Sequence, residues 1–307
     1  MVNNIQSEII FSVIIPHRNS IHFLPKLFSS IPVDERIEII LVDNSPKKVT
    51  KEEIGIEREY ELLWSAPERG AGGARNVGIE AAQGKWYVFA DADDYFSDTA
   101  FDTFFSKADS DAEIIYTCMG GIYYDTGEPS DRGDQFTSKV RGFLKGELTE
   151  MDLRTGFASP CCKMVSAELI RRHSIRYDEV VAHNDNYFSL LSGYYAKKIE
   201  ALDTITYIAT VSRGSLTKRM DYPVIHARFF VTLKRNRFLK EHNMSERQGS
   251  VMVYLYKSLR FGPVKFLGMI IEAIKWRQNI FIGWGRWLQT FSALRNKEKE
   301  DAQYIVK

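Results

Sequence analysis

The chain has 307 residues, 44% of them hydrophobic, so it can bury the core of one large domain or of two. Its three cysteines, Cys118, Cys161 and Cys162, show neither a CxxC pair nor a Cys/His spacing, which argues against a zinc site and a disulfide framework and favours a reducing cytoplasm. No basic and apolar leader follows Met1, and no uncharged apolar stretch reaches the roughly 20 residues that cross a bilayer.

The net charge of +1 conceals an acidic first part and a basic last part. Residues 213–307 contain 19 Lys and Arg against 7 Asp and Glu, so the preceding residues carry the excess of acids. This division is hard to reconcile with uniform binding to nucleic acid. It predicts a catalytic domain followed by a region that meets an anionic surface.

Short apolar stretches predict three strands near the start of the chain, over residues 9–16, 37–42 and 62–64. We expect the first to end at Pro16, because proline cannot continue a central ladder. A helix is expected over residues 21–30.

Residues 68–94 combine a Gly-rich segment, an amphipathic helix, a buried strand and an acidic cluster. The pattern predicts that Gly70, Gly72 and Gly73 form a loop ahead of the helix, where glycine allows close backbone approach. Residues 86–90, WYVFA, are typical of a strand buried in a sheet.

Three carboxylates, Asp91, Asp93 and Asp94, follow that strand at its carboxyl end, where ligands of open α/β sheets bind. Clustered carboxylates repel one another unless water or a cation compensates them, which favours a hard divalent ion with a phosphorylated ligand. The alternative is an acidic N-cap for a helix that begins near Ser97 and Asp98. From these residues alone, the two interpretations have about equal weight.

The alternation of strands and helices predicts right-handed parallel crossovers and a doubly wound α/β sheet. Its carboxyl edge would collect Asn19, Asp43, Arg75 and the Asp91/Asp93 pair into a site for a nucleoside diphosphate. No GxGxxG follows the first strand and no GxxxxGK[ST] occurs, which argues against a nicotinamide or flavin domain and against a P-loop enzyme.

The segments VIIPHRN, IILVDNS and RGAGGARNVGIEAAQGKWYVFADADD resemble, in order and spacing, the first half of family 2 glycosyltransferases with the GT-A fold. The resemblance implies a mixed sheet flanked by helices in a catalytic domain at residues 1–215. Its nucleotide-binding half would span about residues 1–95 and its acceptor half about 96–215. Residues 216–307 would form a basic helical C-terminal region.

The resemblance also implies roles for single residues. Asp43 would contact the nucleobase of a sugar nucleotide, and Asp91 of the DxD motif the ribose or sugar. Asp93 would bind a divalent cation, Mn²⁺ or Mg²⁺, that bridges the diphosphate. The full set of implied donor-binding residues is Pro16, Asn19, Asp43, Arg75, Asp91, Ala92, Arg213 and Lys218. One departure is that His17-Arg18 stands where the family often has an aromatic residue before the Asn.

After the acidic cluster, a buried strand is expected over residues 114–118 and a strand and turn over 120–127. Residues 127–145 lack a firm period and predict a loop, either a mobile cover of the site or an ordinary solvated loop. A helix is expected over residues 166–172, with Ser166 as its N-cap.

The segments SPCCKMVSAELIRRHSIRYDE and VVAHNDNYFSLL resemble the acceptor half of the same family, with Asn184 in place of the first acid of a pair and Asp185 as the second. The resemblance implies that Asp185 is the general base of an inverting transfer. In that single displacement a carboxylate takes the proton of the acceptor hydroxyl while a metal takes up charge on the leaving diphosphate. The alternative for Asp185 is a cap at the start of a helix.

A last strand is expected over residues 205–211, followed by a segment that contains Arg213 and Lys218. In similar enzymes a loop at this place covers the diphosphate, and cations would stabilise the departing group. Simple solubility is the alternative for each of these cations.

Residues 222 onward have helical periodicity, with helices expected over 225–241, 251–259 and 266–276. Basic residues interleaved with Trp and Phe suit a helix that lies on anionic lipid. Packing onto the catalytic domain or onto a second subunit is the alternative.

Three functions are compatible with these observations. The first is metal-dependent, inverting sugar transfer from a nucleotide-diphosphate sugar, UDP-linked by resemblance, to a glycan or lipid-linked acceptor in cell-surface polysaccharide assembly. It would take place in the cytoplasm or at the inner face of the cytoplasmic membrane. The second is a nucleotidyltransferase, and the third is a catalytically silent sugar-nucleotide-binding or scaffold protein.

Overall fold

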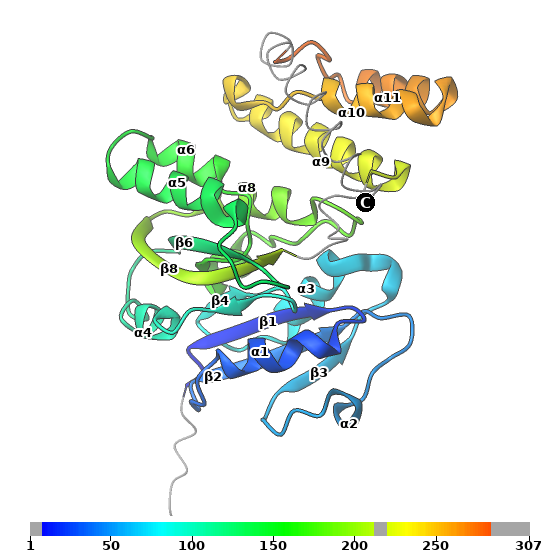
Figure 1. Ribbon diagram of the computed structural model, residues 1–307. Coiled ribbons are helices and arrows are strands. Elements are labelled where there is room, and N and C mark those ends of the chain that lie inside the picture. The colour runs from blue at the N-terminus through cyan, green and yellow to red at the C-terminus, as the bar shows by residue number, and fades with distance from the viewer. Residues whose placement is uncertain (1–7, 212–219, 284–307) are drawn as a thin grey trace, which may run out of the picture. The chain divides into compact units, whose positions relative to one another are not determined.

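An eight-stranded mixed sheet forms the centre of the first of two units, Met1–Lys218 and Arg219–Lys307 (Figure 1). The computed structural model describes residues 8–211 and 220–283. The strands are β1 (Phe11–His17), β2 (Ile37–Asp43), β3 (Glu61–Trp64), β4 (Trp86–Phe89), β5 (Tyr95–Phe96), β6 (Ile114–Tyr123), β7 (Lys163–Ser166) and β8 (Ile199–Val211). Their order across the sheet is β3-β2-β1-β4-β7-β6-β8-β5.

The helices of this unit are α1 (Leu24–Ser29), α2 (Lys51–Ile54), α3 (Gly70–Ala81), α4 (Ala100–Phe105), α5 (Asp134–Leu144), α6 (Glu150–Gly156), α7 (Ala167–Arg172) and α8 (Asn184–Tyr195). Short 3₁₀ turns, η1 (Ile21–Phe23), η2 (Pro67–Arg69) and η3 (Asp131–Gly133), lead into α1, α3 and α5. Figure 1 shows α5 and α6 side by side.

The predicted mixed sheet flanked by helices is confirmed. Strands β3, β2, β1 and β4 are parallel, as the alternation of strands and helices predicts. The wholly parallel arrangement stops at β7, which is antiparallel to both β4 and β6. In the chain, β7 follows β6 after α5 and α6, so no single crossover helix leads into it.

Strand β1 extends one residue past Pro16, where the sequence predicted its end. Pro16 still pairs with Val42 of β2, but the pairing of β1 with β4 stops at Ile14. Ile14 directs its carbonyl to β4, so Pro16, two residues on, faces the same side. The missing N–H of Pro16 therefore falls where no β4 residue needs it.

The prediction of a glycine loop at residues 70–73 is wrong, because α3 begins at Gly70 and includes Gly72 and Gly73. A Cβ atom on Gly72 would lie 2.0 Å from the carbonyl oxygen of Asp178. Gly70 has φ +61°, a left-handed conformation at the start of the helix. The glycines serve close packing of α3 on residue 178 rather than a flexible loop.

The predicted strands at residues 114–118 and from 120 onward are confirmed, but they form one continuous strand, β6, followed by a turn. The prediction of a loop over residues 127–145 is wrong, because this stretch contains α5. The buried side of α5 is formed by Thr137, Val140 and Gly142, two of which give no apolar signal in the sequence. The hydroxyl of Thr137 fixes the helix to β6, since it donates to the carbonyl oxygen of Met119 at 2.8 Å and accepts from its amide at 2.9 Å.

The described part of the second unit is helical, as predicted. It contains α9 (Tyr222–Glu241), η5 (Ser245–Arg247), α10 (Met252–Ser258), η6 (Leu259–Phe261) and α11 (Pro263–Lys275). Its core joins α9, α10 and α11 through Ile225, Phe229, Leu233, Val251, Leu255, Met269 and Ala273. Within residues 8–211 and 220–283, every helix is too short or too polar to traverse a bilayer.

Candidate active site

Asp43 lies at the carboxyl end of β2 and is almost fully buried. Its carboxylate accepts the backbone N–H groups of Ser45 at 2.9 Å and Val49 at 3.0 Å. Burial alone would raise the pKa of Asp43, but these hydrogen bonds, with one from His17, hold it below its ordinary value. Asp43 is therefore a fixed anion at the edge of the sheet.

His17 orients Asp43, a role that the sequence did not reveal. Its Nε2 accepts the N–H of Ser20 at 3.1 Å, so the ring proton lies on Nδ1 and is donated to Asp43 at 3.2 Å. Burial lowers the pKa of His17, which keeps the imidazole neutral. His17 occupies the position where the sequence departs from the family pattern.

Asn19 lies close to this pair, in the loop that follows β1. Its backbone is left-handed, with φ 51°, and its N–H donates to the hydroxyl of Ser45 at 2.9 Å. The exposed Asn19 and the buried Asp43 thus belong to neighbouring loops, as the parallel register of β1 and β2 requires.

The acidic segment after β4 is a tight turn fastened to β8. The hydroxyl of Tyr207 accepts the N–H of Asp91 at 2.8 Å and donates to the carboxylate of Asp94 at 3.0 Å. The backbone N–H of Thr210 donates to Asp94 at 2.7 Å, and its hydroxyl to the carbonyl of Asp93 at 2.6 Å. Asp94 is buried, so it shapes the turn, whereas Asp91 and Asp93 are half-buried.

Asp93 is the candidate metal ligand. Burial, and then the charge of Asp91, raise its pKa above the ordinary value. A cation would relieve this repulsion, so the carboxylate fits a hard divalent ion. Among the described residues no three His, Cys, Asp or Glu side chains come together to hold a metal. An ion at Asp93 would need further oxygen ligands beside this carboxylate.

Arg75 connects the acidic turn to α8. Its guanidinium pairs with Asp91 and donates from Nη1 to Oδ1 of Asn184 at 2.8 Å. It also lies over the ring of Tyr177, 5.2 Å from the centroid. Burial opposes its charge, but the anion of Asp91 outweighs it and raises the pKa of Arg75. The sequence predicted Arg75 near the nucleotide, and the structure gives it two protein partners.

Residues in α3 and just before it also bind the chain that leads into α8. Asn76 donates to the carbonyl of Tyr177 at 3.0 Å and accepts its N–H at 2.8 Å. Arg69, at the end of η2, pairs with Glu179 through Nε at 2.8 Å. These contacts place the loop that leads to Asp185 against α3.

Asp185 lies in the first turn of α8, one residue after Asn184. The N-cap position is taken by His183, whose backbone is left-handed with φ 59°. Burial raises the pKa of Asp185, while the positive charges of Arg75 and Lys163 lower it and the negative charge of Asp91 raises it. Asp185 is thus within electrostatic reach of the acidic turn, as a base acting on the same substrate requires.

Lys163 is a further candidate, which the sequence analysis did not single out. It lies on β7, with 1% of its surface exposed. Its ammonium donates to the hydroxyl of Ser189 at 3.1 Å, and Ser189 follows Asp185 by one helical turn on α8. Burial lowers the pKa of Lys163 to about 8, although Cys162 and Asp185 favour its charge. A lysine amid the apolar residues of CCKMV is the only signal that the sequence offers.

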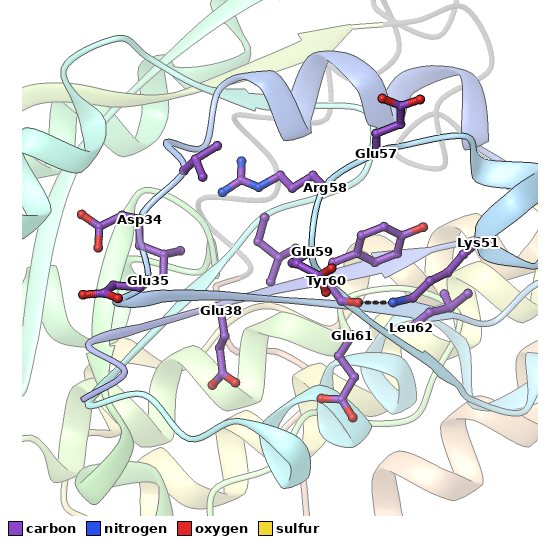
Figure 2. Close-up of a pocket in the computed structure, with 13 residues that line it drawn as sticks. Asp34, Glu35, Glu38, Lys51, Glu57, Arg58, Glu59, Tyr60, Glu61 and Leu62 are labelled. Atoms are coloured by element: carbon purple, nitrogen blue, oxygen red, sulfur yellow. Dashed lines mark hydrogen bonds between the residues drawn. The ribbon is translucent and has the colours of Figure 1, made fainter. Parts of the chain in front are cut away.

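A hollow of about 970 Å³ lies elsewhere, at the start of β2 and along β3, as Figure 2 shows. Its cations are held by backbone: Lys51 donates to the carbonyl of Tyr60 at 2.6 Å, and Arg58 to that of Phe28 at 3.0 Å. It lies at the opposite end of β2 from Asp43 and holds none of the predicted site residues. We therefore assign the site by the convergence of side chains rather than by the size of this hollow.

The sequence-predicted residues Asp91, Asp93, Arg75 and Asp185 thus gather around the end of β4, with Asp43, Asn19 and the buried Pro16 and Ala92 at this edge of the sheet or beside it. Arg213 and Lys218 lie outside the described residues. Their predicted role is therefore untested by this structure.

Comparisons with known proteins identify relatives of the chain. The chain is 23% identical over 222 residues to the glycosyltransferase EpsH of Bacillus subtilis (strain 168), a match over 69% of this chain and 63% of EpsH. It is 24% identical over 215 residues to the poly(ribitol-phosphate) beta-N-acetylglucosaminyltransferase TarS of Staphylococcus aureus (strain Mu50), a match over 66% of this chain and 36% of TarS. The chain thus spans less than two thirds of the length of these relatives.

The crystal structure of S. aureus TarS 1–349 in complex with UDP-GlcNAc is similar in fold, with a TM-score of 0.59 and 22% identity over 74% of this chain and 65% of that one. Residues 12–174, which are more than half of the chain, match the profile of Glycosyl transferase family 2. With the mixed sheet and the acidic turn at its carboxyl edge, this match shows that the chain belongs to glycosyl transferase family 2.

Proposed function

We propose that this protein transfers a sugar, with inversion, from a UDP-sugar to a hydroxyl group of a glycan or lipid-linked acceptor in cell-surface polysaccharide assembly. The observation that carries the proposal is the bridge from Asp91 through Arg75 to Asn184, which brings Asp185 to the acidic turn. The family and the TarS complex with UDP-GlcNAc support the donor class.

The proposed mechanism divides the site between donor and acceptor. Asp43, held as an anion, accepts an N–H group of the nucleobase, and Asn19 lies in the neighbouring loop. Asp93 would hold Mn²⁺ or Mg²⁺ against the diphosphate. When bound, the ion would neutralise charge on the leaving diphosphate. Arg213 and Lys218 add positive charge to the same group in this proposal.

Asp185 acts on the acceptor. Its carboxylate takes the proton of the attacking hydroxyl while the oxygen forms a bond to the anomeric carbon and the bond from that carbon to the diphosphate breaks. Arg75 keeps Asp185 close to the donor side through Asn184, and its charge opposes the rise in the pKa of Asp185 that burial causes. Arg75 is thus a positioning residue.

The proposal also covers the arrangement of the chain. Residues 1–215 form the catalytic domain, with donor binding in about residues 1–95 and acceptor binding in about 96–215. Residues 216–307 are a basic helical region that holds the enzyme at the inner face of the cytoplasmic membrane or joins it to a second subunit.

Thermal-shift measurements of the whole chain with a panel of nucleotide sugars, with and without Mn²⁺, test the proposal. A ligand at 100 times its Kd stabilises the native state by about 2.7 kcal/mol, so a bound UDP-sugar should raise the melting temperature. We expect a larger rise with Mn²⁺, because the proposed ion at Asp93 would strengthen binding of the diphosphate. Nucleotides without a sugar and other nucleotide sugars serve as controls. The proposal fails if no nucleotide sugar shifts the melting temperature, and pyrophosphate release from a nucleoside triphosphate and a sugar phosphate would favour a nucleotidyltransferase.

A further inference from the structure

Helix α11 has apolar residues on two opposite sides. On the inner side, Met269 and Ala273 are fully buried and pack with Ile225 and Phe229 of α9 and Leu255 of α10. These contacts complete the core of the second unit. The residues on the opposite side of α11 do not belong to that core.

The outer side of α11 is a continuous apolar stripe. Val264 is 80% exposed, Leu267 55%, Ile271 53% and Ile274 65%. Their spacing of three and four residues places them along one face of the helix. Single exposed apolar residues are ordinary, but a row of four marks an interaction surface.

Positive charge borders this stripe. Lys275 and Arg277 are exposed at the C-terminal end of the helix, and Lys275 follows Ile274 directly. Lys265 lies on the inner side, with its ammonium over the ring of Tyr222, 4.5 Å from the centroid. The one acidic residue of the helix, Glu272, accepts a hydrogen bond from His226 at 2.8 Å, on the inner side. The surface around the stripe is therefore cationic.

We propose that the outer face of α11 is the surface through which this protein binds an anionic lipid bilayer. The 13 residues of α11 span only about 20 Å, so the helix would lie in the plane of the interface with its apolar stripe among the acyl chains. Lys275 and Arg277 would reach the lipid phosphates.

The charge pattern favours lipid over a second copy of the chain. In a two-fold dimer the same patch faces itself, so Lys275 and Arg277 beside one stripe would face those of the other. Like charges at such a contact repel, whereas an anionic surface attracts all of them.

The inference rests on the proposed location at the membrane and names the surface responsible. Its experiment is flotation of the whole chain with vesicles of phosphatidylcholine, alone or with phosphatidylglycerol. We expect the parent protein to float with the anionic vesicles. The double variant Leu267→Glu/Ile271→Glu should float at least tenfold less. Val33→Glu, which changes a residue 91% exposed in the first unit, should float like the parent.

A second variant, Lys275→Gln/Arg277→Gln, leaves the apolar stripe intact and alters no buried side chain. We expect it to lose binding to the anionic vesicles severalfold and to make the remaining binding insensitive to salt. The thermal shift caused by the nucleotide sugar should be the same in parent and variants, so a failure of lipid binding is distinct from a failure of the proposed transfer.

The inference is overturned if the parent protein does not float with anionic vesicles, or if the Leu267→Glu/Ile271→Glu variant floats equally well. Sedimentation velocity distinguishes the other occupant. A parent dimer that this double variant converts to a monomer, without lipid binding by either, would assign the stripe to a second copy of the chain.

Discussion

Arg75 and Asn184 are 109 residues apart in the sequence and are joined by a hydrogen bond of 2.8 Å from Nη1 to Oδ1. The same guanidinium pairs with Asp91, so one side chain of α3 contacts both the donor side and the acceptor side of the site. An amide oxygen at position 184 accepts this bond without a second negative charge beside Asp185. Asn184, which stands where the family has the first acid of the pair, is thus hydrogen-bonded to Arg75.

Replacing Arg75 should therefore cost both stability and activity. We expect Arg75→Met to lower the free energy of unfolding by about 3 kcal/mol, the lower end of the range for breaking a buried pair, because Asp91 is 42% exposed. Arg75→Lys keeps the charge but cannot bond both partners at once, so it should lose most transfer with a smaller loss of stability. Urea denaturation and a transfer assay measure the two effects.

The matched control is Arg36→Met, which removes an exposed partner of Asp34. It should cost much less stability than Arg75→Met, because water screens an exposed ion pair. If Arg75→Met costs no more than this control, the bridge does not hold the two sides together.

Asp185→Asn should abolish transfer and leave donor binding largely intact. The amide cannot take the acceptor proton, and general-base loss typically costs about 10² to 10⁴ in rate. Rate measurements and donor titration by thermal shift separate the two properties. Asp109→Asn, at a fully exposed surface acid, is the control. Transfer near the parent rate in Asp185→Asn would remove Asp185 from the role of base.

Asp93→Asn tests the metal site. We expect the variant to lose the added stabilisation that Mn²⁺ gives to the complex with a UDP-sugar, because its amide is a weaker ligand for a hard cation than a carboxylate. Asp98→Asn, at an exposed acid close in sequence, should keep the full Mn²⁺ effect. An unchanged Mn²⁺ effect in Asp93→Asn would show that the ion binds elsewhere.

Lys163→Met tests the buried ammonium beside α8. The pKa of Lys163 is about 8 in the fold and 10.5 ordinarily, so the unfolded chain binds more protons between these values and the parent gains stability as the pH rises through them. Near pH 7 the buried charge costs up to about 3 kcal/mol. The variant should therefore be more stable than the parent near pH 7, and the difference should shrink toward pH 10.5.

The same variant should alter catalysis. The charge of Lys163 lowers the pKa of Asp185, so its loss should move the acidic limb of the pH–rate profile to higher pH. Lys47→Met, at a lysine 88% exposed, should change neither the pH dependence of stability nor that limb. A parallel stability profile for parent and Lys163→Met would show that Lys163 is not a perturbed, buried cation.

Local sequence patterns predicted the elements in which residue type alone indicates burial or a helix cap. The largely apolar runs of β1, β2 and β4 are strands buried in the sheet. The hydroxyl of Ser166 caps α7 as predicted, since it accepts the N–H of Leu169 at 3.4 Å. Helix α5 escaped prediction because Thr137 and Gly142 on its buried side gain their place only from partners on other elements.

The site shows the same division. Asp43 and Asp91 follow short buried strands, so their place at the sheet edge follows from the sequence. The partners of Arg75 and Lys163 do not, because Asn184 and Ser189 reach them only through the packing of α8. The antiparallel direction of β7, which brings Lys163 beneath that helix, depends on the whole path of the chain.

Gly72 limits how the acceptor side can vary. Because a methyl group at this position would lie 2.0 Å from the carbonyl oxygen of Asp178, the smallest side chain would push the chain ahead of Asp185 off α3. The separation between the donor carboxylates and the base is thus set by the absence of one carbon atom. Enzymes that diverge from this one toward bulkier acceptors would have to change the surrounding loops and retain the close contact between Gly72 and Asp178.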